Sequence, residues 1–414
     1  MNKSNSLIQK LLQQKSNIAL FCILSMFVGF LTSHLVLSVA TFLLGVNCIW
    51  NIPPRDWLRH KWWLLGCAIV AIYALTGFWS IDKATCEVHW QNKLPILLLP
   101  LAFAYLPKFS VRQIEMLTLF IALILFGAAC YSLYFLVLHF DYYVYHYKLS
   151  QVLPTLADED HVRFSLTIAL FIIWFIYVLP VMQNSFIKWF TGFLTLFLTI
   201  FLHILAAKTG LIALYLFIIC WGGYLLFVKR KWQGAAVLGI LMLLVLFAYK
   251  CIPTFRERVG YISFTYIEYN KGDKSGNYGD IGRLMSYDIA GRIIKEHPWR
   301  GVGVGDMFDE MKKGYDKWYP QVKEENRLLP HNQFLTVALG CGIPAAVLFI
   351  IWVFMPLKSV RRNRDGFFFL TVWLILFLQL MIEPVLEVQN GVFVYIFFLL
   401  FYWHAARQNY LPEK

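Results

Sequence analysis

The chain has 414 residues, of which 59% are hydrophobic, 18% aromatic and only 15% charged. A soluble domain carries about a quarter of charged residues because its surface must be solvated, so this composition excludes a soluble fold. The apolar residues fall in runs of roughly 16 to 25, the length that a helix needs to cross about 30 Å of hydrocarbon. The runs do not alternate with polar residues, which excludes a membrane β-barrel. We therefore predict an all-α polytopic membrane protein.

The chain begins with a polar segment, residues 1–16, that contains three lysines. No small-residue cleavage site follows the first apolar run, so we expect that run to remain as a membrane span rather than to be removed as a signal peptide. The eight cysteines show no CxxC or paired spacing. We expect neither a disulfide framework nor a zinc site, and no cofactor.

The apolar runs predict about twelve transmembrane helices. The first two are separated only by residues 32–34, which predicts a tight hairpin, and the seventh and eighth only by residues 206–210. The predicted spans lie near 17–33, 35–50, 62–80, 93–107, 113–139, 164–182, 187–206, 210–228, 233–251, 332–357, 367–383 and 390–406.

Positive charge alternates between the connections and therefore predicts the orientation. The connections after even-numbered spans hold Arg55, Arg59 and Lys61; Lys108 and Arg112; Lys188; Lys229, Arg230 and Lys231; and Lys358, Arg361, Arg362 and Arg364. We expect a bacterial inner-membrane protein with both termini in the cytoplasm and a large periplasmic loop. The predicted division is a bundle of about nine spans (1–251), the loop (252–330) and a bundle of about three spans (331–414). This pattern explains most of the net charge of +13 without nucleic acid.

Ionisable residues are nearly absent from the middle of the spans and instead gather at the predicted outer end. This group contains Arg163, His203, Lys208, Arg283, His331, Glu383 and Glu387. A charge in a membrane segment is costly and marks a candidate functional site. A flippase or transporter for lipid-linked sugars would need polar groups at mid-membrane and often has repeated halves, neither of which is present. A structural scaffold would not need charge at one face. The pattern favours a site that opens outward.

The predicted outer loop has local structure of its own. Residues 261–279 are rich in Gly, Asn, Lys and Tyr and predict an irregular segment, whereas 280–296 have apolar residues at helical spacing up to His297-Pro298. A glycine turn follows at 301–306, then a second amphipathic stretch through Trp318. The glycines follow no strand, so they predict a turn and not a dinucleotide site.

The two arginines of the predicted loop helix differ in their surroundings. Arg292 has Asp288 four residues before it and Glu296 four residues after it, which predicts ordinary ion pairs on a helix surface. Arg283 has only Asp280 nearby. We therefore expect Arg283 to be the one that is available to bind a substrate anion, with a solvated arginine as the alternative.

Several other polar residues have two interpretations. Lys208 is either an anion ligand at a helix start or an interfacial lysine that reaches the headgroups. Residues 141–147 form an aromatic cluster that is either an interfacial belt or a platform for sugars. Glu383 and Glu387 either orient a base, bind sugar hydroxyls or are solvated loop acids.

Residues 296–305 (EHPWRGVGVG), 330–335 (PHNQFL) and 340–342 (GCG) resemble the signature of the O-antigen ligase and O-antigen polymerase superfamily. The resemblance is sharp over 252–345 and otherwise rests on the number of spans and the place of the loop. It implies a bundle of about twelve helices that transfers a glycan from undecaprenyl diphosphate on the periplasmic side. The acceptor is the lipid A core in ligases, a growing glycan in polymerases and a protein hydroxyl in O-oligosaccharyltransferases; of these we favour the ligase.

The resemblance also implies roles for particular residues. The family's functional histidine falls on His331 and its loop arginine on Arg283, while the arginine after the seventh span is replaced by Lys208. Lysine keeps the charge but loses the planar fork of arginine. We predict His331 as the base, with a capping histidine that only fixes the loop as the alternative. We predict Arg283 and Lys208 as diphosphate ligands, with Arg163, Asn332 and Glu383 as possible supporting residues. No acid cluster has metal-ligand spacing, so we expect a metal-independent transfer.

Overall fold

The computed structural model describes residues 2–149, 151–157, 160–270, 279–361 and 363–408. All regular elements in these ranges are helices, which agrees with the predicted fold class. Among the described residues, eight helices are long and apolar enough to cross a membrane. They lie in α1 (Asn2–Thr32), α4 (Lys61–Leu75, continued to Phe78), α7 (Val111–Leu138), α9 (His161–Val178), α10 (Ser185–Leu205), α11 (Lys208–Gly223, continued to Val228), α12 (Gln233–Cys251) and α18 (Arg364–Ile382).

The remaining predicted spans are less regular. The helix α2 (His34–Ile49) is shorter than these eight, and the predicted span 93–107 contains only the ten residues of α6 (Pro95–Ala104). Ten helical residues reach roughly 15 Å, about half of the hydrocarbon thickness. The last predicted span corresponds to α19 (Gln389–Gln408). The count of twelve therefore stays a prediction.

Both predicted tight connections are confirmed. Ser33 separates α1 from α2, and its side chain accepts a hydrogen bond from the Val36 amide, as an N-cap does. At the second connection, Ala206 ends α10 in the left-handed conformation, with φ 46°. The chain reverses within a few residues at each place, which allows the flanking helices to be neighbours.

The predicted span 332–357 is wrong as a single helix. It consists of α16 (Gln333–Cys341) and α17 (Ile343–Phe354), which are separated at Gly342 with φ 88°. The Ile343 amide donates to the Pro298 carbonyl at 2.8 Å instead of continuing the helix. A Cβ at position 342 would lie 2.4 Å from the Trp299 carbonyl oxygen, so only glycine fits this close approach.

The segment between α12 and α16 is more helical than the sequence predicts. Its predicted helices are present as α14 (Gly279–Glu296) and α15 (Met307–Trp318). The irregular segment predicted from residue 261 is wrong up to residue 270, because α13 (Pro253–Asn270) extends that far, and 271–278 lie outside the described residues. Proline suits a first helical position, and Phe255 is buried against the bundle, so tertiary packing outweighs the weak local helix propensity.

The glycine turn docks this segment onto the bundle. Gly301 and Gly303 have positive φ, and the amides of Val302 and Gly303 donate to the carbonyls of Leu339 and Gly340 at 2.9 and 3.0 Å. The turn therefore pairs with the end of α16 just before its break. Its predicted role as a turn that folds back on the bundle is confirmed.

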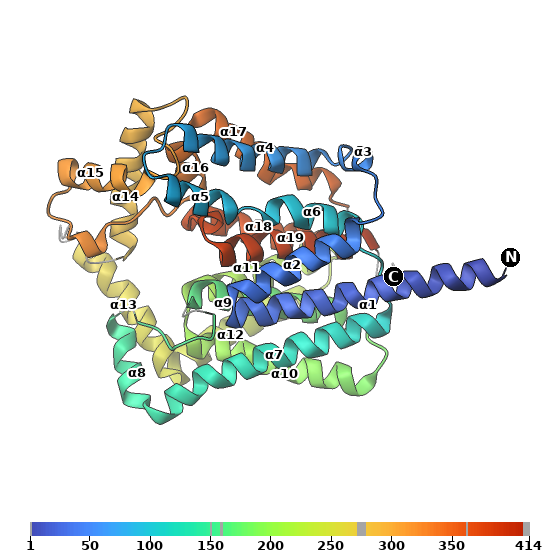
Figure 1. Ribbon diagram of the computed structural model, residues 1–414. Coiled ribbons are helices and arrows are strands. Elements are labelled where there is room, and N and C mark those ends of the chain that lie inside the picture. Colours follow the sequence, from blue (N-terminus) through green and yellow to red (C-terminus); the bar gives the residue numbers. More distant parts are fainter. Residues whose placement is uncertain (1, 150, 158–159, 271–278, 362, 409–414) are drawn as a thin grey trace.

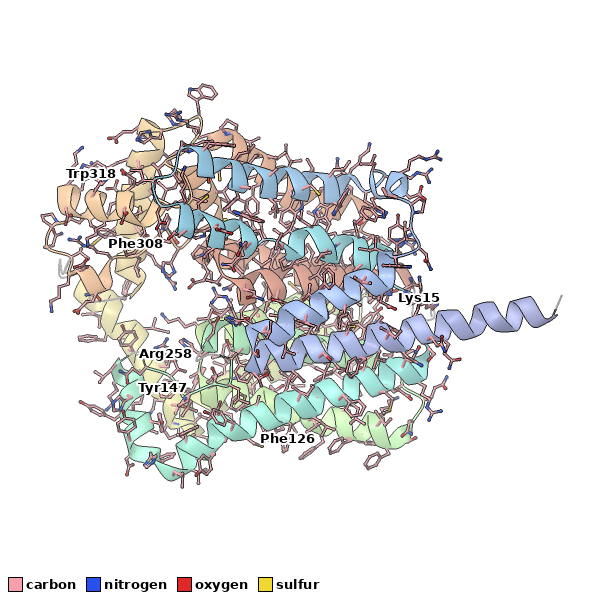
Figure 2. All side chains as sticks on the ribbon, viewed as in Figure 1. Lys15, Phe126, Tyr147, Arg258, Phe308 and Trp318 are labelled. Carbon is pink, nitrogen blue, oxygen red and sulfur yellow. The ribbon has the colours of Figure 1, made fainter. Side chains whose placement is uncertain are left out.

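Figure 1 shows the helices running side by side, with α13, α14, α15 and α8 (Phe140–His146) gathered at one end. We call this the loop end. The opposite end, where α1 begins and α3 (Pro54–Trp57) lies, we call the terminal end. Figure 2 shows Tyr147 and Arg258 at the loop end and Lys15 toward the terminal end. Between the two ends lies a core in which Phe27 of α1 contacts the rings of Phe171 and Phe397.

Candidate functional site

His331 lies at the loop end, immediately before α16. Its Nδ1 is 3.1 Å from Oε2 of Glu383, close enough for an ion pair when the imidazole is protonated. Its backbone carbonyl accepts a hydrogen bond of 2.6 Å from the Tyr287 hydroxyl. The helix is capped instead by Asn332, whose side chain accepts from the amides of Phe334 and Leu335. The imidazole of His331 is therefore not the N-cap.

Glu383 joins the histidine to the loop helix. It follows the end of α18, and its Oε1 accepts a hydrogen bond of 2.9 Å from Arg283 in α14. Burial raises the pKa of the Glu383 carboxyl, but His331, Arg283 and Arg163 together lower it by more. The pKa therefore lies below its ordinary value, and Glu383 is a carboxylate at neutral pH.

Arg283 has a partner that lies outside its local sequence. Its ion pair with Glu383 spans 100 residues of sequence, so no local pattern reveals it. Arg292 behaves as predicted toward Asp288, to which its Nε donates at 2.9 Å, and its guanidinium also lies 5.3 Å from the Trp318 ring. Arg283 thus faces the site, whereas Arg292 belongs to the surface of α14 and α15.

Arg163 approaches the site from α9. Its Nη1 donates to Asp160 at 2.6 Å, and Asp160 caps α9 through the Arg163 amide. A Cβ added at Gly391 would lie 3.0 Å from the Arg163 Nε, so the guanidinium lies against the start of α19. The Val385 carbonyl oxygen, 1.9 Å from such a Cβ, is what restricts position 391 to glycine, and the Arg163 charge acts on Glu383.

Lys208 is the first residue of α11, and its neighbours bring it toward the same site. A Cβ at Gly210 would lie 2.6 Å from the Ser165 carbonyl oxygen, so α11 starts in close contact with the start of α9. Thr209 and Ile382 line one small cavity. Thr209 follows Lys208 and Ile382 precedes Glu383, so Lys208 and Glu383 lie near the same cavity. The starts of α9 and α11 are therefore close to the end of α18.

A second polar group, which the sequence did not reveal, lies deeper. We call it the Glu387 cluster; its members are Tyr73, His89, Lys93, Gln333 and Glu387. The Lys93 Nζ lies 2.9 Å from Oε2 of Glu387, and the same oxygen lies 2.8 Å from Nδ1 of His89. Tyr73 and Gln333 donate to Oε1 at 2.9 and 2.7 Å. Burial raises the pKa of Glu387, but Lys93 and His89 lower it by more.

The local sequence indicates the Glu387 cluster only through the proximity of two of its members to predicted site residues. Glu387 follows Glu383 by four residues, and Gln333 follows Asn332 directly. The sequence places Lys93 at the start of the predicted span 93–107, almost 300 residues from Glu387. Sequence reasoning had no means to pair them. The cluster fixes the start of α16 to the segment after α18, and it thereby positions both halves of the His331–Glu383 contact.

Two other predicted groups lie apart from these contacts. His203 is buried, its Nδ1 lies 2.7 Å from the Thr199 carbonyl oxygen, and its Nε2 lies 2.9 Å from the Tyr215 hydroxyl. In the aromatic cluster, Tyr147 is buried and donates to the Leu205 carbonyl at 2.8 Å, while Tyr142 is exposed. Tyr147 is therefore structural. The two interpretations, an interfacial belt and a platform for sugars, apply only to the exposed rings.

These features define a multi-pass helical membrane protein with a polar site at one end of its bundle. A family model described as O-antigen ligase matches residues 193–350, which is less than half of the chain. Over this range the chain is similar to the O-antigen ligase superfamily, and this similarity supports an activity of the glycan ligase or transferase type. The matched range contains Lys208, Arg283 and His331 but neither Arg163 nor Glu383. A search of curated proteins gave no match.

Proposed function

We propose that the chain transfers a glycan from an undecaprenyl diphosphate donor to an acceptor hydroxyl at the loop end, on the periplasmic side of the bacterial inner membrane. The lipid A core is the acceptor that we favour, which makes the protein a ligase. The observation that carries this proposal is the contact of His331 with Glu383, which is itself paired with Arg283. A base, its orienting acid and a cation for the leaving group thus lie together.

His331 acts as the general base. A carboxylate next to Nδ1 favours the tautomer with hydrogen on that nitrogen and leaves Nε2 to accept the acceptor's proton. The start of α16 adds partial positive charge, which disfavours a permanent imidazolium. Positioned bases of this kind contribute roughly 10² to 10⁴ in rate.

Arg283 and Lys208 bind the donor diphosphate, and Arg163 supports them. A guanidinium has five N–H donors in a planar fork, and Arg283 places one beside Glu383 at the site. Lys208 starts α11, where backbone amides also favour an anion. Fixed cations of this kind stabilise charge that appears on the leaving oxygen.

The reaction balances without a further reagent. The bond between the anomeric carbon and the diphosphate oxygen breaks, and a bond forms from that carbon to the acceptor oxygen. The hydroxyl proton passes to His331, and the electron pair of the broken bond leaves on undecaprenyl diphosphate. In the metal-independent transfer that we propose, the cations Arg283, Lys208 and Arg163 neutralise the product diphosphate.

The first experiment uses the purified full chain with lipid-linked glycan and lipid A core. We expect release of undecaprenyl diphosphate together with a glycosylated core, and no transfer without either substrate. Transport of the donor across a vesicle bilayer without any new glycosidic bond would instead support a flippase and contradict the proposal.

The second experiment is the surface-glycan profile of a deletion strain. Loss of all long glycan from the lipid A core supports a ligase. Single repeats that remain on the core support a polymerase, and loss of glycan from protein supports an O-oligosaccharyltransferase. Each of the last two outcomes contradicts the favoured acceptor.

The predicted orientation is tested by single cysteines in a background without the native ones. Position 312 lies in α15 at the loop end (Figure 1), and position 229 directly follows the candidate span Lys208–Val228, so we expect it at the opposite end of the bundle. We expect Lys312→Cys to react with an impermeant reagent in whole cells and Lys229→Cys to be protected. The reverse result would place the site on the cytoplasmic side.

A further inference from the structure

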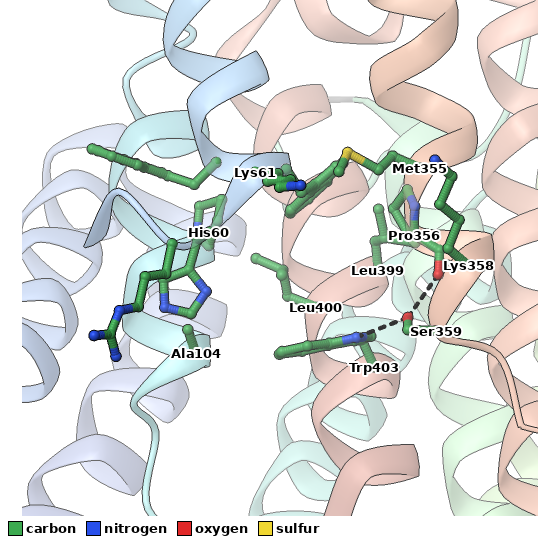
Figure 3. Close-up of a pocket in the computed structure, with 14 residues that line it drawn as sticks. His60, Lys61, Ala104, Met355, Pro356, Lys358, Ser359, Leu399, Leu400 and Trp403 are labelled. Atoms are coloured by element: carbon green, nitrogen blue, oxygen red, sulfur yellow. Dashed lines mark hydrogen bonds between the residues drawn. The ribbon is translucent and has the colours of Figure 1, made fainter. Parts of the chain in front are cut away.

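A separate cavity of about 340 Å³ lies at the terminal end, away from the proposed catalytic residues. It is enclosed by the start of α4, the end of α6, the segment Met355–Ser359 after α17 and the end of α19 (Figure 3). Its volume is within the range of pockets that hold small molecules. None of its lining residues has a place in the proposed transfer.

The mouth of this cavity is basic. Arg59, Lys61 and Lys358 line it, and no acidic residue is among its lining residues. Arg59 pairs with Asp56 on the solvent side at 3.3 Å, so one cation is partly compensated. The two lysines are exposed. The field at the mouth therefore attracts an anion, because like charges gather there without an acid in the wall.

The walls are apolar and carry three indole rings that are held in place. Trp62 donates to the Trp352 carbonyl at 2.8 Å and stacks on its ring at 5.1 Å between centroids. Trp63 donates to the Leu97 carbonyl at 2.8 Å. Trp403 donates to the Ser359 hydroxyl at 3.2 Å, a bond that Figure 3 draws. Such walls are formed before any ligand arrives, which reduces the entropy cost of binding.

The floor of the cavity gives it an amphipathic character. Pro100, Ala104, Leu399 and Leu400 line the part between α6 and α19. An inorganic anion would satisfy the lysines but leave this apolar surface without a partner. A molecule with an anionic head and a hydrocarbon body would fill both parts. Indoles next to lysines at a span end are also the pattern that proteins place at lipid headgroups.

We propose that this cavity binds one anionic phospholipid, with the phosphate between Lys61 and Lys358 and the beginning of an acyl chain against Ala104 and Leu400. The three indoles hold the glycerol region. This site is distinct from the donor-diphosphate site, since it lies at the opposite end of the bundle and shares no residue with it.

The test measures lipid binding to the purified full chain by native mass spectrometry. Phosphatidylglycerol and phosphatidylcholine with the same acyl chains are compared, and inorganic phosphate is added as a competitor. We expect phosphatidylglycerol to bind more tightly than phosphatidylcholine, and phosphate not to displace it at equal concentration. Equal binding of the two lipids, or displacement by phosphate alone, would overturn the proposal.

Two independent variants separate charge from shape. Lys61→Gln with Lys358→Gln removes the mouth charge and should weaken phosphatidylglycerol binding about tenfold or more, since a basic residue near a membrane surface contributes roughly fivefold. Ala104→Phe fills the floor and should remove the bound lipid while the lysines remain. The matched control is Lys229→Gln with Lys231→Gln, two exposed cations outside the cavity. Wild-type binding by both cavity variants, or equal loss in the control, contradicts the assignment.

Discussion

Glu383 and Glu387 are four residues apart, yet their surroundings differ. The Glu387 side chain is 5% exposed and Lys93 is 1% exposed, and both carboxylate oxygens of Glu387 have close partners. Glu383 is 14% exposed, and its partners His331 and Arg283 are 22% and 31% exposed. Within the Glu387 cluster only His89, at 15%, is as exposed as Glu383, so the Glu387 carboxylate itself is closed off, whereas the Glu383 contacts are accessible to a substrate.

Charge therefore has two uses in this membrane protein: one carboxylate is structural and the other is accessible to a ligand. A buried carboxylate with all its partners in place has nothing left to offer a ligand, so the Glu387 cluster fixes the backbone. A carboxylate at an accessible edge can exchange partners when a substrate arrives. Gln333 and the neighbouring His331 show how close the two uses are, because one side chain points to Glu387 and the other to Glu383.

His331→Ala gives the largest expected effect and tests the accessible group. Loss of the base should lower turnover by roughly 10² to 10⁴, while the donor still binds and the thermal unfolding temperature changes little. Turnover is measured with lipid-linked donor, beside a thermal unfolding curve. His139→Ala, an exposed histidine at the same end, is the control. Near-normal turnover in His331→Ala would remove the catalytic role.

Glu387→Gln tests the closed group. It leaves Lys93 buried without its counter-charge, which should lower the free energy of unfolding by about 3–5 kcal/mol. Calibrated denaturation in detergent measures this loss. The matched control is Glu87→Gln, because Glu87 is an exposed acid on the nearby helix α5 (Lys83–Gln91).

A double variant separates the effect of the unpaired charge on stability from the effect of side-chain shape in the Glu387 cluster. Adding Lys93→Met to Glu387→Gln removes the unpaired charge and should recover part of the lost stability. If Glu387→Gln unfolds like the wild type but abolishes transfer, the Glu387 cluster takes part in the chemistry and its role is not structural.

Much of this architecture follows from local sequence. The hairpin at Ser33, the reversal at Ala206 and the end of α14 before His297-Pro298 depend on caps, glycines or prolines within a few residues. These signals act over one helical turn and need no knowledge of the fold. The motif around His331 likewise lies in one continuous segment.

The rest depends on contacts between distant segments. The break at Gly342 occurs because residues 298–303 pair with the end of α16, and α13 gains its stability by packing. The Arg283–Glu383 pair joins residues 100 apart. The hydrophobic pattern predicts where most helices occur, but it does not predict which polar side chains contact one another at the ends of these helices. Those contacts decide which arginine faces the site.

Arg283→Ala and Arg292→Ala sharpen the distinction within α14. Arg283→Ala removes a cation beside the leaving group and should lower turnover by roughly 10² to 10³. Arg292→Ala removes a surface pair with Asp288 that contributes only about 0.3–0.5 kcal/mol. Lys208→Arg should retain activity because it keeps the charge. The measurement is single-turnover transfer with saturating acceptor; loss in Arg292→Ala with retention in Arg283→Ala would reverse the two roles.

The smallest expected effect concerns Asn332, which stands between the two polar groups. Its side chain caps α16 through two amides and also donates to the Met381 carbonyl at 3.1 Å, so it joins the start of α16 to the end of α18. Asn332→Ala should cost about 1 kcal/mol of stability and shift His331 relative to Glu383. Asn332→Asp retains the capping oxygen but loses the amide donor, and it should recover the stability more than the turnover. Unfolding curves and turnover measured on the same preparations check this. Equal recovery of stability and turnover in Asn332→Asp would mean that the contact with Met381 does not position the site, and that Asn332 acts through the cap alone.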